Sequence, residues 1–260
     1  MRWGVLFALC VGLWSVGTAP SVRAGEDAAE DAAKAGERVA MVVAVKGRAT
    51  AKNADGETRK LEMKSAIHIG DVLQTRSKSA LQIIFLADKT TITIGQKARM
   101  RIDDYHFKAG DRNSKCETSL AQGAFKVLGG TIAKTAPGNV KVKTPTATIG
   151  IRGTLGMGVE TPGPAGPPDL GDGPIDPQNP PPGGANDTVF MGGNAVGVSG
   201  TGPNAGQQTL LSGNPGTGCR TEFGSPPGNP RPYSAGEIGQ IANAVSLAPG
   251  GGDDDDDDDD

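Results

Sequence analysis

VKVKTPTATIGIRGTLGMG, residues Val140 to Gly158, is the stretch that decides how this chain folds. It opens with Val140, Val142 and Thr144 at every second position, separated by Lys141 and Lys143. This is the period-two pattern of a half-buried strand. Pro145 interrupts the pattern, and a proline inside a strand indicates an edge, a bulge or a bend. Four glycines follow at spacings where a backbone turns tightly or approaches another backbone. The stretch therefore predicts a strand, a corner and a second strand.

Outside this stretch, short strand patterns alternate with turns, and only one helix pattern is visible. The clearest hairpin joins residues 81–86 to residues 90–94. In residues 99–103, Met100 and Ile102 are predicted to face inward, and Arg99, Arg101 and Asp103 outward. The chain is therefore predicted to be all-β, as a sandwich, a barrel or a short β-roll of many short strands. The other predicted strands are 38–50, 59–63, 119–127, 131–134, 188–191, 195–198 and 207–211, with a polar loop at 108–117.

Composition divides the chain into segments. Residues 1–24 resemble a secretory signal, because an apolar run from Val5 to Val16 is followed by a small-x-small site at Val22–Ala24. We expect cleavage after Ala24, with an uncleaved anchor as the alternative, since the run is too short to span a bilayer well. The mature protein is then periplasmic or secreted, and it contacts membrane only through the signal before cleavage. An acidic, alanine-rich tether is predicted at residues 25–38.

The β domain is predicted over residues 39–215, interrupted at 161–187 by a Gly/Pro-rich insertion. This insertion holds too few apolar residues to offset the entropy of ordering, so we expect it to be disordered. A C-terminal segment at 216–248 carries one short helix, because Ser234 and Glu237 form a capping box and apolar residues follow at helical spacing. Residues 249–260 are a glycine linker and a tail of eight aspartates.

The central stretch also resembles a known family. Its T-P-T-A-T-I-G-I-R-G-T sequence is similar to the T-P-x-A-x-x-G-V-R-G-T motif of the FecR-type domain, a periplasmic sensor and regulator domain. Weaker similarities to that family extend over residues 39–159, including Asp88-Lys89-Thr90 against a D-G-T hairpin. Signalling members control a sigma factor through a cytoplasmic segment and a membrane span; neither is visible here, so that mechanism is not carried over. The family-motif residues are Thr144, Pro145, Thr146, Gly150, Arg152, Gly153 and Thr154.

Removal of the signal leaves two cysteines, Cys116 and Cys219. An exported protein matures where disulfides form, so we predict that these two pair, with two free thiols as the alternative.

Charge is distributed unevenly along the chain. Residues 38–160 hold 21 Lys and Arg against 10 Asp and Glu, a net charge of +11, whereas residues 253–260 carry −8. The basic region could steer a polyanion, although lysines on strands also prevent edge-to-edge pairing. The acidic tail could hold Ca²⁺ weakly, although such runs are usually solvated. We expect the tail to fold back transiently on the basic domain and to compete with external polyanions.

No motif predicts catalysis, a cofactor or a metal site. The two histidines, His68 and His106, lie in no ligand pattern, and the glycines at 153–158 are in the wrong order for a dinucleotide loop. Nucleic acid is not expected as a partner, because stacking aromatics are scarce. The sequence thus predicts an exported, non-enzymatic protein with a regulatory, sensory or scaffolding role at the cell envelope, through contacts with an envelope protein or polymer. The alternative is an envelope polyanion-binding or cation-binding protein that uses the basic β surface or the acidic tail.

Overall fold

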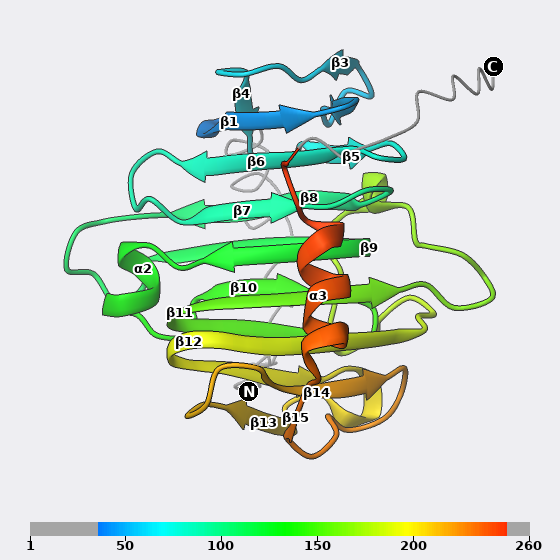
Figure 1. Ribbon diagram of the computed structural model, residues 1–260. Coiled ribbons are helices and arrows are strands. Elements are labelled where there is room, and N and C mark those ends of the chain that lie inside the picture. Colours follow the sequence, from blue (N-terminus) through cyan, green and yellow to red (C-terminus); the bar gives the residue numbers. More distant parts are fainter. Residues whose placement is uncertain (1–35, 249–260) are drawn as a thin grey trace, which may run out of the picture. The chain divides into compact units, whose positions relative to one another are not determined.

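The computed structural model describes residues 36–248. The predicted signal at 1–24, most of the tether at 25–38 and the tail at 249–260 therefore lie outside the described residues. Within the described part, the all-β prediction is confirmed, because fifteen strands form one hydrogen-bonded sheet (Figure 1). The strands are β1 Arg38–Lys46, β2 Ala49–Lys52, β3 Thr58–Lys60, β4 Ala66–His68, β5 Val72–Thr75, β6 Ala80–Phe85, β7 Thr91–Ile94, β8 Arg99–His106, β9 Lys115–Leu128, β10 Val140–Lys143, β11 Ala147–Thr161, β12 Ala185–Gly200, β13 Gln208–Leu211, β14 Thr217–Glu222 and β15 Arg231–Pro232. The α-helices are α2 Thr131–Thr135 and α3 Ala235–Ala244, and single 3₁₀ turns lie at η1 Leu170–Asp172 and η2 Gly202–Asn204.

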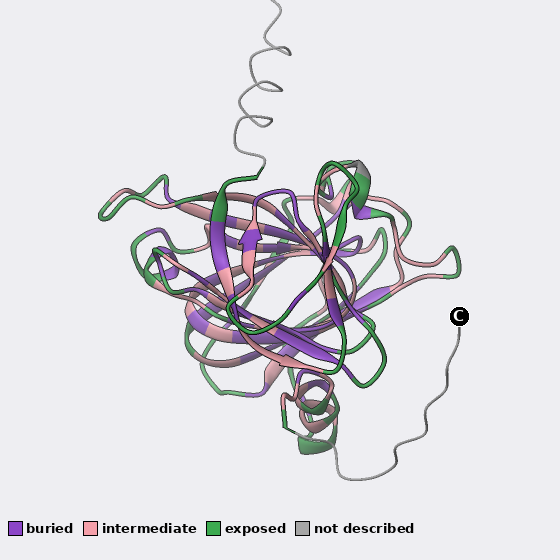
Figure 2. Cartoon of the chain, turned by 90° about the horizontal axis from the view of Figure 1, so that it is seen from above, coloured by how far each residue is buried: buried purple, intermediate pink, exposed green. Residues whose placement is uncertain are grey.

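Three long strands bend so that the single sheet forms two layers. The first half of β9 pairs with β8 and β10, whereas its second half pairs with β7 and β11. β11 and β12 are divided in the same way, and β12 pairs with β14 near its start and with β13 near its end. The front layer, over which α3 lies in Figure 1, runs β4-β1-β6-β7-β9-β11-β12-β14-β15, and the back layer runs β3-β2-β5-β8-β9-β10-β11-β12-β13. Figure 2 shows these strands curving around a common interior.

Glycines allow the long strands to bend. β9 passes from the back layer to the front at Gly123, where φ is +103° and a Cβ would lie 2.6 Å from the Cβ of Ala98. β11 passes between layers at Gly153, where φ is +66°. Residues other than glycine rarely adopt such φ values, so Gly123 and Gly153 are needed for the backbone to bend at these two points. The predicted strand, corner and strand are confirmed, with β10 and β11 antiparallel around residues 144–146.

Alternating apolar side chains fill the space between the layers. The aromatic rings of Phe85, Phe125 and Phe190 are fully buried there. Met100 and Ile102 of β8 face inward as predicted, and neither is exposed. Truncating one buried phenylalanine to alanine would destabilise such a core by about 3–5 kcal/mol.

Two local predictions are wrong. Residues 131–134 form the short helix α2 instead of a strand, because Gly129 and Gly130 carry the chain out of the sheet and the Thr131 N–H bonds to the Asp88 carbonyl (2.7 Å). The predicted polar loop at 108–117 ends early, since β9 begins at Lys115 and buries Cys116. β14 and β15 were not predicted, because their residues lack an apolar run.

The Gly/Pro-rich insertion has almost no regular structure, but disorder is the wrong description for its middle. Leu170 and Ile175 are buried against Ala121 of β9 and Val72 of β5. The Ile175 N–H donates to the hydroxyl of Ser119 (2.8 Å). A few apolar anchors thus hold a segment that is otherwise poor in apolar residues, because small side chains on the back layer let it approach closely.

Helix α3 is confirmed where the capping box predicted it. The Ser234 hydroxyl accepts from the Glu237 N–H (3.2 Å), and the Glu237 carboxylate accepts from the Ser234 N–H (2.7 Å). The helix buries Ile241 against Met157 and Val189 on the outer side of the front layer. Neither α3 nor α2, the helices of residues 36–248, is long and apolar enough to cross a membrane.

Candidate functional site

The first half of the family motif forms a buried turn between β10 and β11. Thr144 and Thr146 are fully buried, and the Thr144 hydroxyl accepts from the Ala147 N–H (3.0 Å). The Thr201 hydroxyl donates to the Pro145 carbonyl (2.8 Å), which ties the turn to the end of β12. Each of these groups bonds within the chain, so the turn offers little to a ligand.

A buried carboxyl lies beneath this turn. Glu160 is 1% exposed, and its Oε2 accepts from the Thr146 hydroxyl (2.7 Å) and from the Asn186 amide (3.2 Å). The other oxygen, Oε1, has no hydrogen-bond partner. Burial raises the pKa of Glu160 to about 7, because a charge is poorly solvated there. The arrangement suits a carboxyl that is largely protonated below neutral pH, and sequence reasoning missed it because β11 brings it to the motif from 14 residues away.

The second half of the motif, from Gly150 to Thr154, lies on β11 itself. The Arg152 guanidinium donates to Gln208 on β13 (3.2 Å), and Gly153 makes the bend between layers. The Thr154 hydroxyl donates to the Gly192 carbonyl at the neighbouring bend of β12. Gly150 pairs with Gly197 on β12, where two glycines face each other across the ladder. The motif residues therefore build the fold, and they do not converge on a cavity.

The predicted disulfide is not formed in the structure. Cys116 and Cys219 are both free and buried. Cys116 lies on the back-layer half of β9, where it faces Val140 and Tyr105, whereas Cys219 lies on β14 of the front layer, opposite Thr188. Spacing along the chain could not reveal that the two cysteines belong to different layers. Burial raises the pKa of the Cys219 thiol to about 11 and that of Cys116 well above its ordinary value, which makes both poor nucleophiles.

The histidines and their acidic neighbours form structural pairs. Asp71 is 1% exposed and accepts from the Arg59 guanidinium and from the backbone N–H of His68 (2.8 Å). His106 lies 4.0 Å from Asp111. Within residues 36–248, no group of three or more His, Cys, Asp or Glu side chains is placed to hold a metal ion.

Asp103 was predicted to face solvent, but its side chain is only 3% exposed. Its carboxylate accepts from the Ser119 hydroxyl (2.7 Å), and burial raises its pKa to about 7. Its neighbour Asp104 pairs with Lys115 (2.5 Å). The register of β8 against β9 shifts between Ile102 and Asp104, and the two adjacent carboxylates have different partners.

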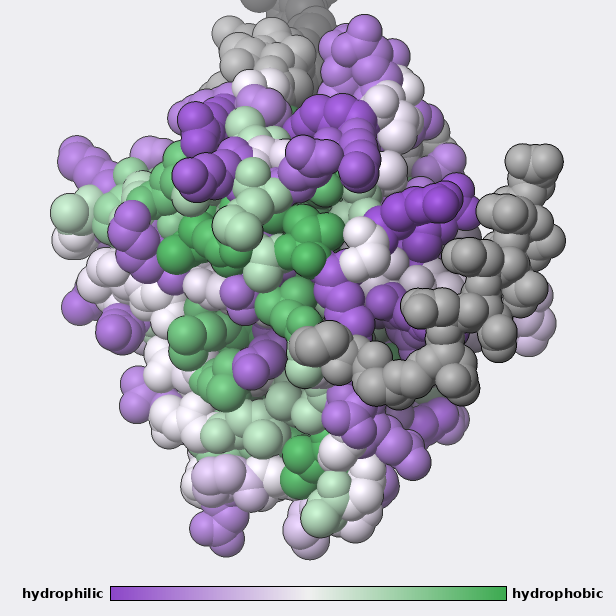
Figure 3. All heavy atoms as spheres, turned by 45° about the horizontal axis from the view of Figure 1, so that its top comes forward, coloured by the Kyte–Doolittle hydropathy of each residue, from purple (hydrophilic) through white to green (hydrophobic). Residues whose placement is uncertain are grey.

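A row of apolar side chains crosses the outer side of the front layer. Strand register places Met41 opposite Ile84, Ile84 opposite Thr91, Thr91 opposite Leu128, and Leu128 opposite Leu155. Directly paired residues share one face of a sheet, so these side chains lie side by side. Leu128 is 53% exposed and the others are half-buried. We name this set, Met41, Ile84, Leu128 and Leu155, the apolar row; Figure 3 shows hydrophobic side chains gathered in a band over this face.

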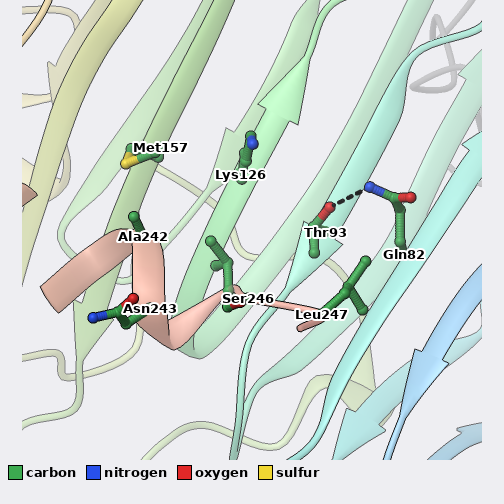
Figure 4. A pocket seen from close by; sticks show the side chains of 9 residues that line it. Gln82, Thr93, Lys126, Met157, Ala242, Asn243, Ser246 and Leu247 are labelled. Atoms are coloured by element: carbon green, nitrogen blue, oxygen red, sulfur yellow. Dashed lines mark hydrogen bonds between the residues drawn. The ribbon is translucent and has the colours of Figure 1, made fainter. Parts of the chain in front are cut away.

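Next to the apolar row, the end of α3 leaves a shallow pocket of about 390 Å³. Met157, Lys126, Thr93 and Gln82 line its floor (Figure 4). Its wall is formed by Ala242, Asn243, Val245, Ser246 and Leu247. Gln82 donates to the hydroxyl of Thr93 (3.0 Å), so part of the floor is already hydrogen-bonded. The residues that line this pocket include no acid–base pair and no activated nucleophile, so it fits a binding site better than a catalytic site.

One edge of the sheet, where β1 leads into β2, β5 into β6 and β7 into β8, carries exposed cations. Arg48, Arg76 and Lys97 lie on successive turns, because the Arg76 N–H bonds to the Arg48 carbonyl and the Lys97 N–H to the Arg76 carbonyl (3.1 Å each). Lys46 precedes them at the end of β1. We call these four residues the basic edge. Sequence reasoning detected the positive charge but not its location, because the four belong to three separate turns.

Comparison with known protein families agrees with the motif. Residues 71–164, which include the strands from β5 to β11, match the model of the family described as FecR protein. No curated protein matches the sequence. Proteins of this family are regulatory sensors rather than enzymes, and the domain is typically periplasmic. The chain therefore contains a FecR-type domain, at residues 71–164.

Proposed function

We propose that this chain is an exported, non-enzymatic FecR-type protein that acts at the cell envelope in a regulatory, sensory or scaffolding role by binding another protein. The observation that carries the proposal is the apolar row on the front layer. Its exposed leucine, Leu128, lies between Thr91 of β7 and Leu155 of β11, whereas most exposed residues elsewhere on the sheet are polar or charged. Apolar side chains that gather on one outer face of a sheet mark interaction sites.

The shape of the surface suggests the kind of partner. The apolar row is bordered on one side by α3 and its shallow pocket, where Lys126 and Asn243 supply polar groups. An amphipathic segment of an envelope protein would place its apolar side chains on Leu128 and Ile84 and its polar side chains toward Lys126. The buried motif would hold the strands that present this surface.

Site-specific photo-cross-linking tests the proposal. A photoreactive amino acid replaces Leu128 in the full chain, and the protein is irradiated with the envelope fraction of its source cells. The matched control carries the same group at Leu210, which is 50% exposed on β13 of the back layer. We expect a discrete adduct with one envelope protein from position 128 and none from position 210. The same adduct should be lost when Ile84→Lys places a charge in the apolar row of this chain.

Identical products from the two positions would contradict docking at the apolar row. An adduct formed only between two copies of the chain would replace the proposed partner with self-association. Adducts with envelope protein at neither position, together with retention on envelope polymer, would favour the second candidate function, polyanion binding at the basic edge.

A further inference from the structure

The basic edge has no carboxylate partners among the described residues. Arg48, Arg76 and Lys97 are exposed, and Lys46 is half-buried. Within residues 36–248, none of these four cations forms an ion pair, and the nearby Glu62 is already paired with Lys60 (3.1 Å). Neighbouring strands and turns lie about 5 Å apart, so four like charges on adjacent turns repel one another. An anion placed along this edge would relieve that repulsion.

The chain leaves the described region at this same edge. The end of α3 lies over Gly95, where a Cβ would come within 2.1 Å of the Ala244 carbonyl oxygen. From there the chain crosses the front layer, and Lys46 donates to the Ala248 carbonyl (2.5 Å). The last described residue is therefore held beside the first cation of the basic edge.

The sequence beyond Ala248 has the complementary charge. Residues 249–252 are Pro-Gly-Gly-Gly, and residues 253–260 are eight aspartates. At about 3.3–3.6 Å per residue, the four-residue linker can carry the first aspartate some 15 Å from Ala248, and the acidic run is long enough to follow all four cations. Attachment at this point also gives the tail a high effective concentration at the basic edge.

We propose that Asp253–Asp260 binds the basic edge of its own molecule and thereby masks it from other polyanions. Each carboxylate contact is exposed and individually weak, so the tail exchanges among the cations instead of adopting one pose. Salt shortens the Debye length from about 10 Å at 0.1 M to about 3 Å at 1 M, so the contact is lost as salt rises. This inference does not depend on docking at the apolar row.

Zero-length cross-linking tests where the tail binds. A carbodiimide adds to an aspartate carboxyl to form an O-acylisourea. A lysine amine then attacks the acyl carbon to form an amide, and the carbodiimide leaves as a urea, which carries the elements of the water lost in the condensation. With the full chain at low salt, we expect tail peptides joined to Lys46 and Lys97. Lys52 and Lys134, which are exposed elsewhere, are the internal controls. At 1 M salt the links to Lys46 and Lys97 should fall at least several-fold.

Equal labelling of Lys134 and Lys97 would overturn the proposal. A mixture of isotope-labelled and unlabelled protein separates links within one molecule from links between two. If the links join labelled to unlabelled chains, the tail binds a second copy and the proposal is wrong as stated.

A charge-matched pair of variants tests the masking itself. Deletion of residues 253–260 should raise the salt concentration that elutes the protein from heparin resin. In the Arg76→Gln/Lys97→Gln background, the same deletion should have a much smaller effect. In the Lys52→Gln/Lys134→Gln background, which removes equal charge, the effect should be undiminished. An equal effect of the deletion in both backgrounds, or no effect in the parent chain, would contradict masking at this edge.

Discussion

The family motif and the apolar row use their side chains in opposite ways. The hydroxyls of Thr144 and Thr146 bond inside the chain, and Gly153 serves only the bend of β11. Leu128 and its neighbours match no motif, but they lie on the outer side of the front layer. The residues by which the family is recognised are thus the ones that build the fold. The residues that a partner can reach are outward positions of strands, where the fold tolerates many side chains.

The sharpest way to break this comparison is to substitute the motif glycine. Gly153→Val should destabilise the protein by about 3 kcal/mol, because a β-branched side chain is strained at positive φ and its Cβ would lie 3.0 Å from the Asn194 amide. Gly224→Val is the matched control, since its φ is +74° but open space surrounds it. Urea unfolding should show a clearly larger loss for Gly153→Val. Equal losses would mean that the motif position has no special packing role.

A change at the buried carboxyl should have an effect of the opposite sign that depends on pH and reaches a similar size only above pH 7. The pKa of Glu160 is raised from 4.5 to about 7 in the folded protein, so folding favours the protonated form. The contribution of Glu160 to the free energy of unfolding is fully present below pH 4.5 and is lost as the pH rises through about 7. Glu160→Gln avoids the buried charge and should be more stable than the parent above pH 7, by up to about 3 kcal/mol.

Thermal unfolding at a series of pH values measures this difference for Glu160→Gln and for the control Glu222→Gln, an exposed carboxylate on β14. Asp103, whose pKa is also raised, contributes equally to parent and variant and cancels. The gap between the Glu160→Gln variant and the parent should open between pH 4.5 and about 7. A gap that does not change with pH would show that the carboxyl is solvated in the folded protein.

The smallest stability effect is expected on the outer surface. Leu128→Lys should change the free energy of unfolding by no more than about 0.5 kcal/mol, because the side chain is 53% exposed and the lysine can extend into solvent. Chemical denaturation measures this, and Leu120→Lys, at a fully buried position of the same strand, provides the contrast. A large loss for Leu128→Lys would mean that the apolar row supports the fold rather than a partner.

The sequence predicted most local elements for clear physical reasons. Alternation placed Met100 and Ile102 in the core, and the Ser234–Glu237 capping box located the start of α3. The D-K-T turn was matched to a family pattern with glycine in the middle, and Lys89 there adopts a φ of +66°. Predictions failed where long-range contacts override local pattern. Two apolar anchors order the insertion, and the free cysteines lie in different layers.

By itself, the sequence determined that the chain is all-β, where its corners lie, that its termini and its β region carry opposite charge, and that it resembles a FecR domain. These properties depend on periodicity, backbone conformation and composition, which are local. Only the tertiary structure decided that Glu160 lies under the Thr-Pro-Thr turn, that Met41 and Leu155 belong to one apolar row, and that three separate turns form one basic edge. The reason is that strand register and the bends between layers join residues far apart in the chain, and no local pattern specifies which strands become neighbours.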